Sequence, residues 1–428
     1  MREGHASHTQ AQVQVRFESF HPSLIGTLPE NSLLIPTSVC SSELRELLTS
    51  LFLSKELSFD NFDFSIDGQF LSGSLGSFLA RNSWSHENLL TILIIPRIQK
   101  PKSIAFSLQT DDWVSSIAPL KNGASSFMAF GDYSGKLHFV DSLEHNTISS
   151  SLLIDGEMPI KSVLATPSSS YLVVSHKFSS SLVSMKSKEA IMGVTDGHSN
   201  TIESAAIMQE SQSSILFATG SFDRSIRISE FNLSPIVTSS TKIVLEGHSG
   251  AVTGLASACS IPSGMASGGV ISPSLLISAS LDGSSRHWDL VKEEMISTTA
   301  HGVPLLGIAL CPSDPNLMAS PAADLTVRLW DARQKNSCFK SLHGHKLLPT
   351  AVVFSKSSTS GLYSVGQDGV IKTWDLRITG KRATSDSSIG ETVMQQSNQL
   401  FSLALVEEAG KFALAVGGDQ GLQLVSIE

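Results

Sequence analysis

Three segments of the chain share one plan and recur at a nearly constant interval. Each has an apolar stretch ending in Ser, a turn that contains Asp, and an alternating stretch closed by Trp-Asp. The segments are LLISASLDGSSRHWD, LMASPAADLTVRLWD and LYSVGQDGVIKTWD, ending at Asp289, Asp331 and Asp375, 42 and 44 residues apart. Such an interval matches the roughly 40 to 45 residues of a four-stranded propeller blade. Because one blade cannot bury its faces alone, the pattern predicts a ring of blades.

Weaker copies extend the repeat in both directions. One copy, LFATGSFDRSIRISE, covers 216–230 and has Ser229 where the Trp is expected. Two degenerate units fill 112–186, and a last unit runs to Glu428. Gly-His or Ala-His pairs precede the Asp turns and support the register, with their histidines at His198, His248, His301 and His345. Seven units of about 45 residues predict a seven-bladed propeller of WD repeats.

The seventh unit supplies only three strands before the sequence reaches Glu428. We expect residues 103–108, just before the first unit, to add the fourth strand and close the ring. Closure removes an exposed strand edge that would promote aggregation. The expected propeller therefore occupies 103–428.

Residues 11–96 do not follow the repeat. Val13, Val15 and Phe17 alternate with polar residues like a half-buried strand, whereas 41–53 carries Leu at helical spacing. Further short strands are expected at 31–36, 62–66 and 89–95. This order is that of a ubiquitin-like β-grasp domain, with 97–102 as the linker. The expected fold class is thus an all-β seven-bladed WD40 propeller preceded by a small α+β ubiquitin-like domain.

Each blade whose sequence follows the repeat closely is expected to bury a hydrogen-bonded chain of His, Ser, Asp and Trp, in which every polar group has a partner. The expected sets are His248, Ser278, Asp282, Trp288; His301, Ser320, Asp324, Trp330; and His345, Ser364, Asp368, Trp374. Histidines that recur once per blade behave as structural residues, so stability is the expected role of these sets. The missing Trp of the third blade, and the missing His of the first, second and seventh, predict weaker cooperativity in those blades.

Motifs for catalysis or cofactor binding are missing from the sequence. It contains no GxxxxGK[ST], GxSxG or HExxH pattern, which argues against an enzyme and predicts no cofactor. Cysteines at 40, 259, 311 and 338 lack metal-ligand and disulfide spacing, so we expect no metal of the protein's own and a reducing compartment. The longest apolar run, 89–96, is too short to span a bilayer, and 1–12 lack an apolar stretch. A soluble protein, not secreted by the usual route and without a membrane partner, is expected.

Several segments resemble one known family over nearly the whole chain. QVQVRF at 12–17, SELRELL, FDFSIDGQFLSGSLGSFL and SHENLLTILI are similar to a Notchless-type ubiquitin-like domain, and DDWVSSI at 111–117 is similar to the family's propeller entry. The family is the WD-repeat subunit of the nucleolar PeBoW assembly of Pescadillo, Block-of-proliferation and WD-repeat proteins. Notchless itself has one more blade. The resemblance implies a noncatalytic factor for large (60S) subunit maturation and pre-rRNA processing, in the nucleus, nucleolus and nucleoplasm.

The resemblance also implies partners and one site residue. The propeller would dock on the Block-of-proliferation partner within PeBoW, and the midasin ATPase would bind the small domain to release the factor from pre-60S particles. Alignment of the family's Ser-x-Glu loop on SWSHENLLTILI places the ligand of midasin's Mg²⁺ at Glu87. Mg²⁺ takes hard oxygen ligands in strict geometry, so a shorter Asp should fit poorly. His86 departs from the small polar residue expected there, and without the resemblance Glu87 would be a solvated surface residue.

Two other readings stay open at this stage. A WD40 substrate receptor or scaffold of a ubiquitin ligase would associate with cullin-type partners instead of pre-60S particles, whereas a propeller hydrolase lacks a nucleophile and base. The formal net charge of −9 argues against an extensive RNA interface. Arg97, Lys100 and Lys102 in the linker are the candidates for direct RNA contact, and a solvated linker is the alternative.

Overall fold

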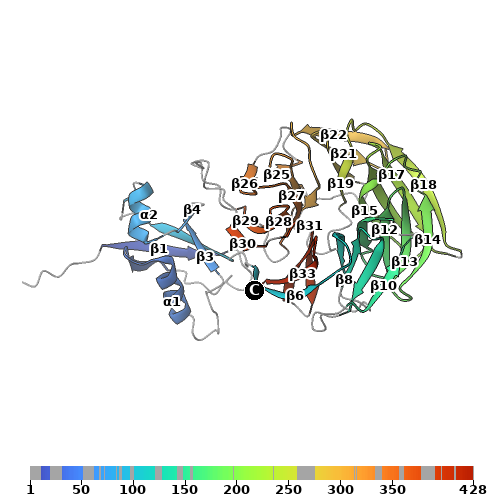
Figure 1. The fold of residues 1–428 in the computed structure, drawn as a ribbon. Helices are drawn as coiled ribbons and strands as arrows, with labels where there is room; N and C mark the ends of the chain where they lie inside the picture. Colours follow the sequence, from blue (N-terminus) through green and yellow to red (C-terminus); the bar gives the residue numbers. More distant parts are fainter. Residues whose placement is uncertain are drawn as a thin grey trace, which may run out of the picture. The chain divides into compact units, whose positions relative to one another are not determined.

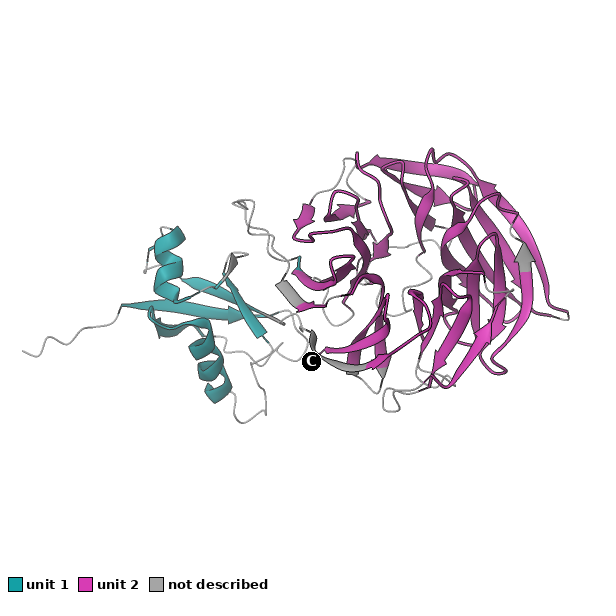
Figure 2. Ribbon diagram, viewed as in Figure 1, with its two compact units in different colours: residues 1–99, 375–388 teal, residues 100–374, 389–428 magenta. Residues whose placement is uncertain are grey.

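A computed structural model describes residues 11–19, 31–51, 62–66, 69–71, 73–82, 84–85, 89–96, 101–120, 128–141, 148–154, 158–195, 197–234, 236–257, 275–312, 314, 316–332, 340–355, 361–376, 391–396, 398–408 and 411–427. The chain divides into two units, residues 1–99 with 375–388 and residues 100–374 with 389–428 (Figure 2). Each unit is considered by itself.

The first unit contains a five-stranded sheet in the order β2-β1-β5-β3-β4. Strand β1 pairs parallel with β5, and the other pairs described are antiparallel. A parallel central pair flanked by antiparallel strands is the arrangement of the expected β-grasp fold. In chain order, the elements are β1 (Gln12–Glu18), β2 (Leu33–Pro36), α1 (Ser41–Leu51), β3 (Phe62–Ile66), β4 (Gln69–Phe70), α2 (Leu75–Asn82) and β5 (Leu90–Pro96).

Side-chain alternation explains the core of this unit. Val13, Val15 and Phe17 of β1 are buried between exposed neighbours and pack with Leu44 and Leu48 of α1. At the start of α1, the Glu43 carboxylate accepts the amide of Cys40 at 2.9 Å, which caps the helix. Helix α2 was not foreseen from the sequence. Its eight residues bury one apolar face in the same core, at Leu75, Phe78 and Leu79.

The second unit consists of seven four-stranded antiparallel sheets that surround a centre (Figure 1). The fold class expected from the repeat is therefore confirmed. The first four blades are β7 (Val114–Pro119), β8 (Met128–Asp132), β9 (Lys136–Val140) and β10 (Ser150–Leu153); β11 (Ile160–Ala165), β12 (Tyr171–His176), β13 (Ser179–Ser184) and β14 (Glu189–Thr195); β15 (Ile202–Glu210), β16 (Ser214–Ser221), β17 (Ile226–Asn232) and β18 (Thr238–Leu245); β19 (Val252–Ser257), β20 (Leu275–Ser280), β21 (Ser284–Asp289) and β22 (Glu294–Ala300).

The last three blades complete the ring. They are β23 (Ala309–Leu310), β24 (Leu317–Pro321), β25 (Thr326–Asp331) and β26 (Lys340–His343); β27 (Pro349–Phe354), β28 (Gly361–Gly366), β29 (Val370–Asp375) and β30 (Glu391–Gln395); and β31 (Leu400–Glu408), β32 (Lys411–Gly418), β33 (Gly421–Ile427) and β6 (Pro101–Leu108).

Strand β6 supplies the outer strand of the seventh blade. It pairs antiparallel with β33, with Leu108 opposite Leu422 and Phe106 opposite Leu424. The strand begins at Pro101, two residues before the expected 103–108, so residues 101 and 102 of the expected linker lie in the blade. Ring closure thus joins segments from opposite ends of the propeller sequence.

Hydroxyl groups join the innermost strands of neighbouring blades. The bonds run from Ser204 to the carbonyl of Val252, from Thr253 to Leu305, from Thr350 to Leu400, from Ser402 to Val114, and from the amide of Val163 to Ser116. An ion pair between Lys161 and Glu203, 3.3 Å apart, joins the second and third blades. These strands line a central cavity of about 250 Å³. The inner strands are therefore held by specific polar contacts as well as by apolar packing.

Candidate functional site

The residue that the resemblance assigns to the partner's Mg²⁺ is not among those described. Glu87, with His86 and Asn88, lies in the short gap before β5. On either side of the gap, Trp84 packs its ring edge-on against Phe78 with centroids 6.0 Å apart, and Leu89 is half exposed. The role of Glu87 as a ligand of the partner's Mg²⁺ remains a proposal.

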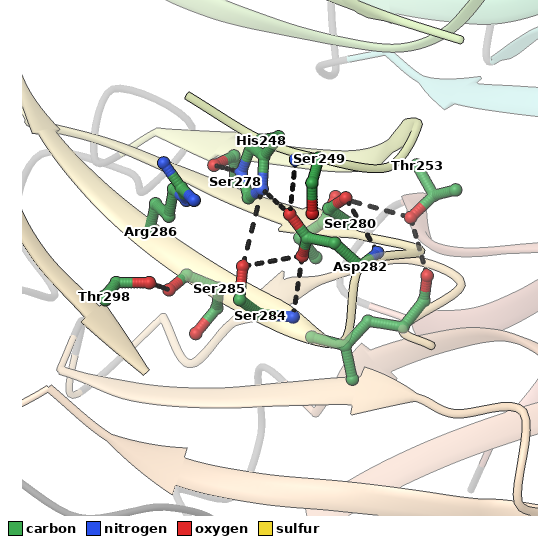
Figure 3. Close-up of polar contacts among 12 residues, drawn as sticks. His248, Ser249, Thr253, Ser278, Ser280, Asp282, Ser284, Ser285, Arg286 and Thr298 are labelled. Atoms are coloured by element: carbon green, nitrogen blue, oxygen red, sulfur yellow. Dashed lines mark hydrogen bonds and ion pairs between the residues drawn. The ribbon is translucent and has the colours of Figure 1, made fainter. Parts of the chain in front are cut away.

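The fourth blade contains the complete hydrogen-bonded chain that the sequence predicts. His248 Nδ1 lies 2.8 Å from Asp282 Oδ2, and His248 Nε2 lies 2.7 Å from Ser278 Oγ. Trp288 Nε1 donates to the same hydroxyl at 2.9 Å. Figure 3 shows the histidine between the serine of β20 and the aspartate of the following turn. Residues 34 positions apart in sequence thus meet inside one blade.

The sixth blade repeats this chain. His345 Nδ1 lies 3.1 Å from both carboxylate oxygens of Asp368, and His345 Nε2 lies 2.7 Å from Ser364 Oγ. Trp374 Nε1 donates to Ser364 at 2.8 Å. Both chains that the sequence predicts for these blades form in the structure.

Electrostatics fixes the proton positions in the two chains. Burial lowers the pKa of His248 and of His345, and outweighs the opposing effect of the neighbouring aspartates. Burial alone would raise the pKa of Asp282, but hydrogen bonds from Ser284 and His248 lower it to about 2. Both imidazoles are therefore neutral at pH 7, and the Asp282 carboxylate is charged. The indole then donates to the serine, the serine to Nε2, and Nδ1–H to the carboxylate, so that every polar atom is paired.

The set predicted for the fifth blade is wrong. His301 Nδ1 and Trp330 Nε1 are buried and have no hydrogen-bond partner among the described residues. Ser320 donates to the carbonyl of Gly307 instead. The Asp324 carboxylate accepts from Arg328 at 2.7 Å instead of from the histidine.

The residue before the histidine explains part of this difference. Gly247 and Gly344 precede His248 and His345, the histidines of the complete chains. The φ angles of these glycines are 149° and 151°, which residues with an L side chain rarely adopt. The fifth blade has Ala300 at that position, and Ala300 remains in strand β22, paired with Ser284. The next side chain, His301, consequently points Nε2 at Ser285 of the fourth blade, 3.0 Å away.

A proline in β24 explains the rest. Pro321 occupies the strand position held by Ala279 in β20 and Val365 in β28, where the neighbouring inner strand pairs. Because proline has no amide hydrogen, this ladder bond is lost. Strand β23 is accordingly only two residues long, and the displaced Gly307 carbonyl takes up the Ser320 hydroxyl.

The third blade forms a network that the sequence reasoning did not assign. His198 Nδ1 lies 2.8 Å from Asp223, and His198 Nε2 lies 3.1 Å from the Thr219 hydroxyl. The signal was present in Gly197-His198 and its 25-residue spacing to Asp223. The absent Trp concealed it, because Ser229 occupies that position. In the first and second blades, local pairs, Asp132 with His138 and His176 with Ser181, stand in for the loop histidine.

The Ser-His-Asp order of these chains looks like a catalytic triad but cannot act as one. Ser278 and Ser364 are completely buried, and each hydroxyl already accepts an indole N–H. A nucleophile must be reachable by its substrate, so these networks stabilise the blades. Within the described ranges, no three His, Cys, Asp or Glu side chains converge as a metal site. The helices of the described residues are all too short or too polar to cross a bilayer.

Known protein families match both units. The NLE (NUC135) domain matches residues 13–79, and the WD domain, G-beta repeat, matches residues 190–228 and 336–375. The latter two segments cover parts of the third and sixth blades.

Relatives with the same name match almost the whole chain. "Ribosome biogenesis protein ytm1" of Aspergillus fumigatus is 26% identical, over 99% of this chain and 92% of the relative. The protein of that name from Aspergillus oryzae is 27% identical, over 99% of this chain and 92% of the relative. The one from Schizosaccharomyces pombe is 24% identical, over 96% of each chain. The resemblance to the WD-repeat subunit of PeBoW is thereby confirmed: over nearly its whole length the chain is similar to the ytm1 ribosome biogenesis proteins, with a match to the NLE domain followed by matches to WD repeats.

Proposed function

We propose that this chain is a noncatalytic ribosome biogenesis factor that acts in the maturation of the large ribosomal subunit and in pre-rRNA processing. Its place of action would be the nucleolus and the nucleoplasm. The propeller would dock on a Block-of-proliferation-type WD-repeat protein, in a complex with Pescadillo. The NLE domain would be the handle by which the midasin ATPase removes the factor from pre-60S particles.

The observation that supports this proposal is the joint match of both units. Relatives named ribosome biogenesis proteins align from the NLE domain to the last blade, over 99% of this chain. A ribosome biogenesis role follows from that similarity. A noncatalytic role fits the buried Ser278 and Ser364 hydroxyls, which hold blades together.

Chemistry supports Glu87 as the handle. Mg²⁺ in a partner's site takes hard oxygen ligands such as carboxylates, and it enforces near-octahedral geometry. Residue 87 lies between the partly buried Trp84 and the half-exposed Leu89, shortly before the central strand β5. A strand at the centre of the sheet is a firm attachment point, through which a pulling force can act on the domain.

Two experiments test the proposal at different depths. Sucrose-gradient sedimentation of the tagged chain should place it with pre-60S particles; association with cullin-type proteins and absence from these particles would favour the ubiquitin-ligase alternative. Pull-down by midasin's adhesion domain in Mg²⁺ should succeed for wild type and fail for Glu87→Ala and Glu87→Asp.

Glu46→Ala is the matched control for the pull-down. It removes an exposed carboxylate from α1 of the same domain and should leave binding unchanged. Equal capture of wild type, Glu87→Ala and Glu87→Asp would refute Glu87 as the ligand and leave the ribosome biogenesis role standing.

A further inference from the structure

One end of the propeller carries the turns between the second and third strands of the blades. In six blades a turn amide donates to a carbonyl just before the blade's first strand, which fixes both segments at the same end. The bonds run from Tyr133 to Trp113, Phe222 to Thr201, Leu281 to Ala251, Ala323 to Pro304, Gln367 to Leu348 and Asp419 to Gln399, at 2.9 to 3.1 Å. We call this end the turn face.

Exposed aromatic side chains gather on one side of the turn face. Trp113, Phe178 and Phe222 are 47%, 38% and 41% exposed and belong to the first, second and third blades. Trp113 is held in place, because it stacks on Phe401 with centroids 5.1 Å apart and meets Tyr133 edge-on at 6.0 Å. Within the described residues, these three are the Phe and Trp side chains that count as exposed. Aromatic groups in such positions are typical of protein interfaces.

Two basic residues beside these aromatics adopt an unfavourable backbone conformation. Lys177 has φ 42° and Arg224 has φ 72°. In the turns of the first, fourth and sixth blades, glycine takes the left-handed position. A side chain in this region costs about 1 kcal/mol or more, and such strain tends to persist where it serves a function. Neither turn requires a lysine or an arginine for its backbone conformation, because glycine occupies the same position in other blades.

Two of the acidic residues near these turns, Asp223 and Glu203, already have partners. The Asp223 carboxylate binds His198, the Ser225 hydroxyl and two amides, and its side chain is 9% exposed. Glu203 is paired with Lys161. Glu246 is exposed on the next loop, which leads into the fourth blade.

The two cations are available for binding. Lys177 lies over the Phe178 ring, 5.0 Å from its centroid, and Arg224 is exposed. Lys177 thus lies against an aromatic ring, and in the described parts of these two turns neither cation forms an ion pair with a carboxylate.

We infer that Trp113, Lys177, Phe178, Phe222 and Arg224 form the surface on which the propeller docks its protein partner. This assignment rests on the proposed function, in which that partner is the Block-of-proliferation-type WD-repeat protein. The complementary surface presents Asp or Glu carboxylates beside apolar side chains. Arg224 accepts a carboxylate through its guanidinium fork while the phenyl rings exclude water from the pair.

A nucleic-acid partner fits this surface less well. Affinity for a phosphate backbone comes from many Lys and Arg contacts. The surface offers one exposed cation, Arg224, and one partly buried cation, Lys177, and the chain has a formal net charge of −9. Aromatic side chains with a few cations match a protein surface better.

The test measures binding of the full chain to the purified Block-of-proliferation partner by isothermal titration calorimetry. Arg224→Gly and Lys177→Gly should each weaken binding at least tenfold, and Phe222→Ala should do so as well. Both glycine variants relieve backbone strain, so their melting temperatures should be equal to or above that of wild type. Weaker binding by a protein that is not less stable separates a docking role from a structural one.

Leu325→Gly is the matched control. Leu325 is 38% exposed with φ 68° in the equivalent turn of the fifth blade, outside the aromatic cluster. The Leu325→Gly variant should bind the partner with the same affinity as wild type. If wild type binds and the Arg224, Lys177 and Phe222 variants stay within twofold of it, or if Leu325→Gly loses as much, the assignment of this surface is overturned while the proposed partner stands.

Two other outcomes also decide the question. If wild type does not bind the partner at all, the proposed function loses its docking step and this assignment falls with it. If Arg224→Gly weakens binding to a single-stranded RNA 20-mer in a filter assay but leaves the protein partner's affinity unchanged, the surface is a nucleic-acid site and the inference is wrong.

Discussion

The guanidinium of Arg328 lies 2.7 Å from the carboxylate of Asp324, whose counterparts in the third, fourth and sixth blades bind a loop histidine. With this exchange of partner, His301 Nδ1 and Trp330 Nε1 are among the buried polar atoms of the fifth blade that have no hydrogen-bond partner within the described residues. One blade of the ring is thus held by an ion pair at its rim, where other blades have a buried chain. The contrast between otherwise similar blades makes the energetic role of the networks measurable.

Removal of the central serine should lower the free energy of unfolding more in the fourth blade than in the fifth. Ser278→Ala strands the Trp288 indole and His248 Nε2, at about 1 to 3 kcal/mol for each buried group. Ser320→Ala removes a single bond to a backbone carbonyl and should cost about 1 kcal/mol. Urea unfolding of both variants checks this difference; equal losses would mean that the buried chain adds no more stability than the single hydrogen bond of Ser320.

Ala300→Gly and Pro321→Ala together should stabilise the protein, although neither suffices alone. Glycine allows the loop to turn as it does before His248, and alanine restores the missing ladder amide. Pairing of His301 and Trp330 would then raise the free energy of unfolding by about 1 to 3 kcal/mol. A double-mutant cycle provides the measurement. Strictly additive effects of the two substitutions would contradict this shared mechanism.

Stability should fall as the pH drops from about 6.5 towards 4. Burial lowers the pKa of His301 from 6.5 to about 4 in the folded protein, and also lowers that of His198, His248 and His345. The unfolded chain therefore binds protons at a higher pH than the native state. The contribution of these neutral histidines is full above the unfolded pKa and is lost as the pH falls through the folded pKa.

Urea unfolding at several pH values between 7.5 and 4.5 measures this effect. His301→Gln removes one of the titrating groups and should flatten the slope relative to wild type. An unchanged slope in this variant would show that His301 does not titrate with folding.

Closure of the ring should be sensitive to a single methyl group. Gly421 begins β33 with φ 114°, and a Cβ there would clash with the carbonyl oxygen of Leu108 in β6. Gly421→Ala should destabilise the propeller by more than about 2 kcal/mol and speed hydrogen exchange along β33.

Gly302→Ala separates this clash from backbone strain. Gly302 also has a positive φ, 73°, but a Cβ there would meet no atom within 4 Å. It should cost only about 1 kcal/mol. If both variants lose the same stability, contact between β33 and β6 is not what closes the ring.

Helix α2 illustrates a limit of local sequence patterns. Its eight residues, LGSFLARN, include Gly and Ser and give little helical signal. The helix exists because Leu75, Phe78 and Leu79 enter the core that β1 and α1 form. By contrast, the longer pattern in 41–53 predicts α1, because leucines at helical spacing already define a buried face.

The sequence alone determined the features that depend on a local period. Alternation of apolar residues and the Trp-Asp interval predict the strands, the seven blades and two of the three buried chains, since these patterns repeat within about 45 residues. The tertiary structure decided whether a given blade completes its chain. Ala300 and Pro321 look like minor departures in the sequence, yet one cannot adopt the φ angle of Gly247 and the other cannot donate the ladder bond. Likewise, only the closed ring brings Trp113 against Phe401, 288 residues away, because no local pattern encodes a contact made by the last blade with the first.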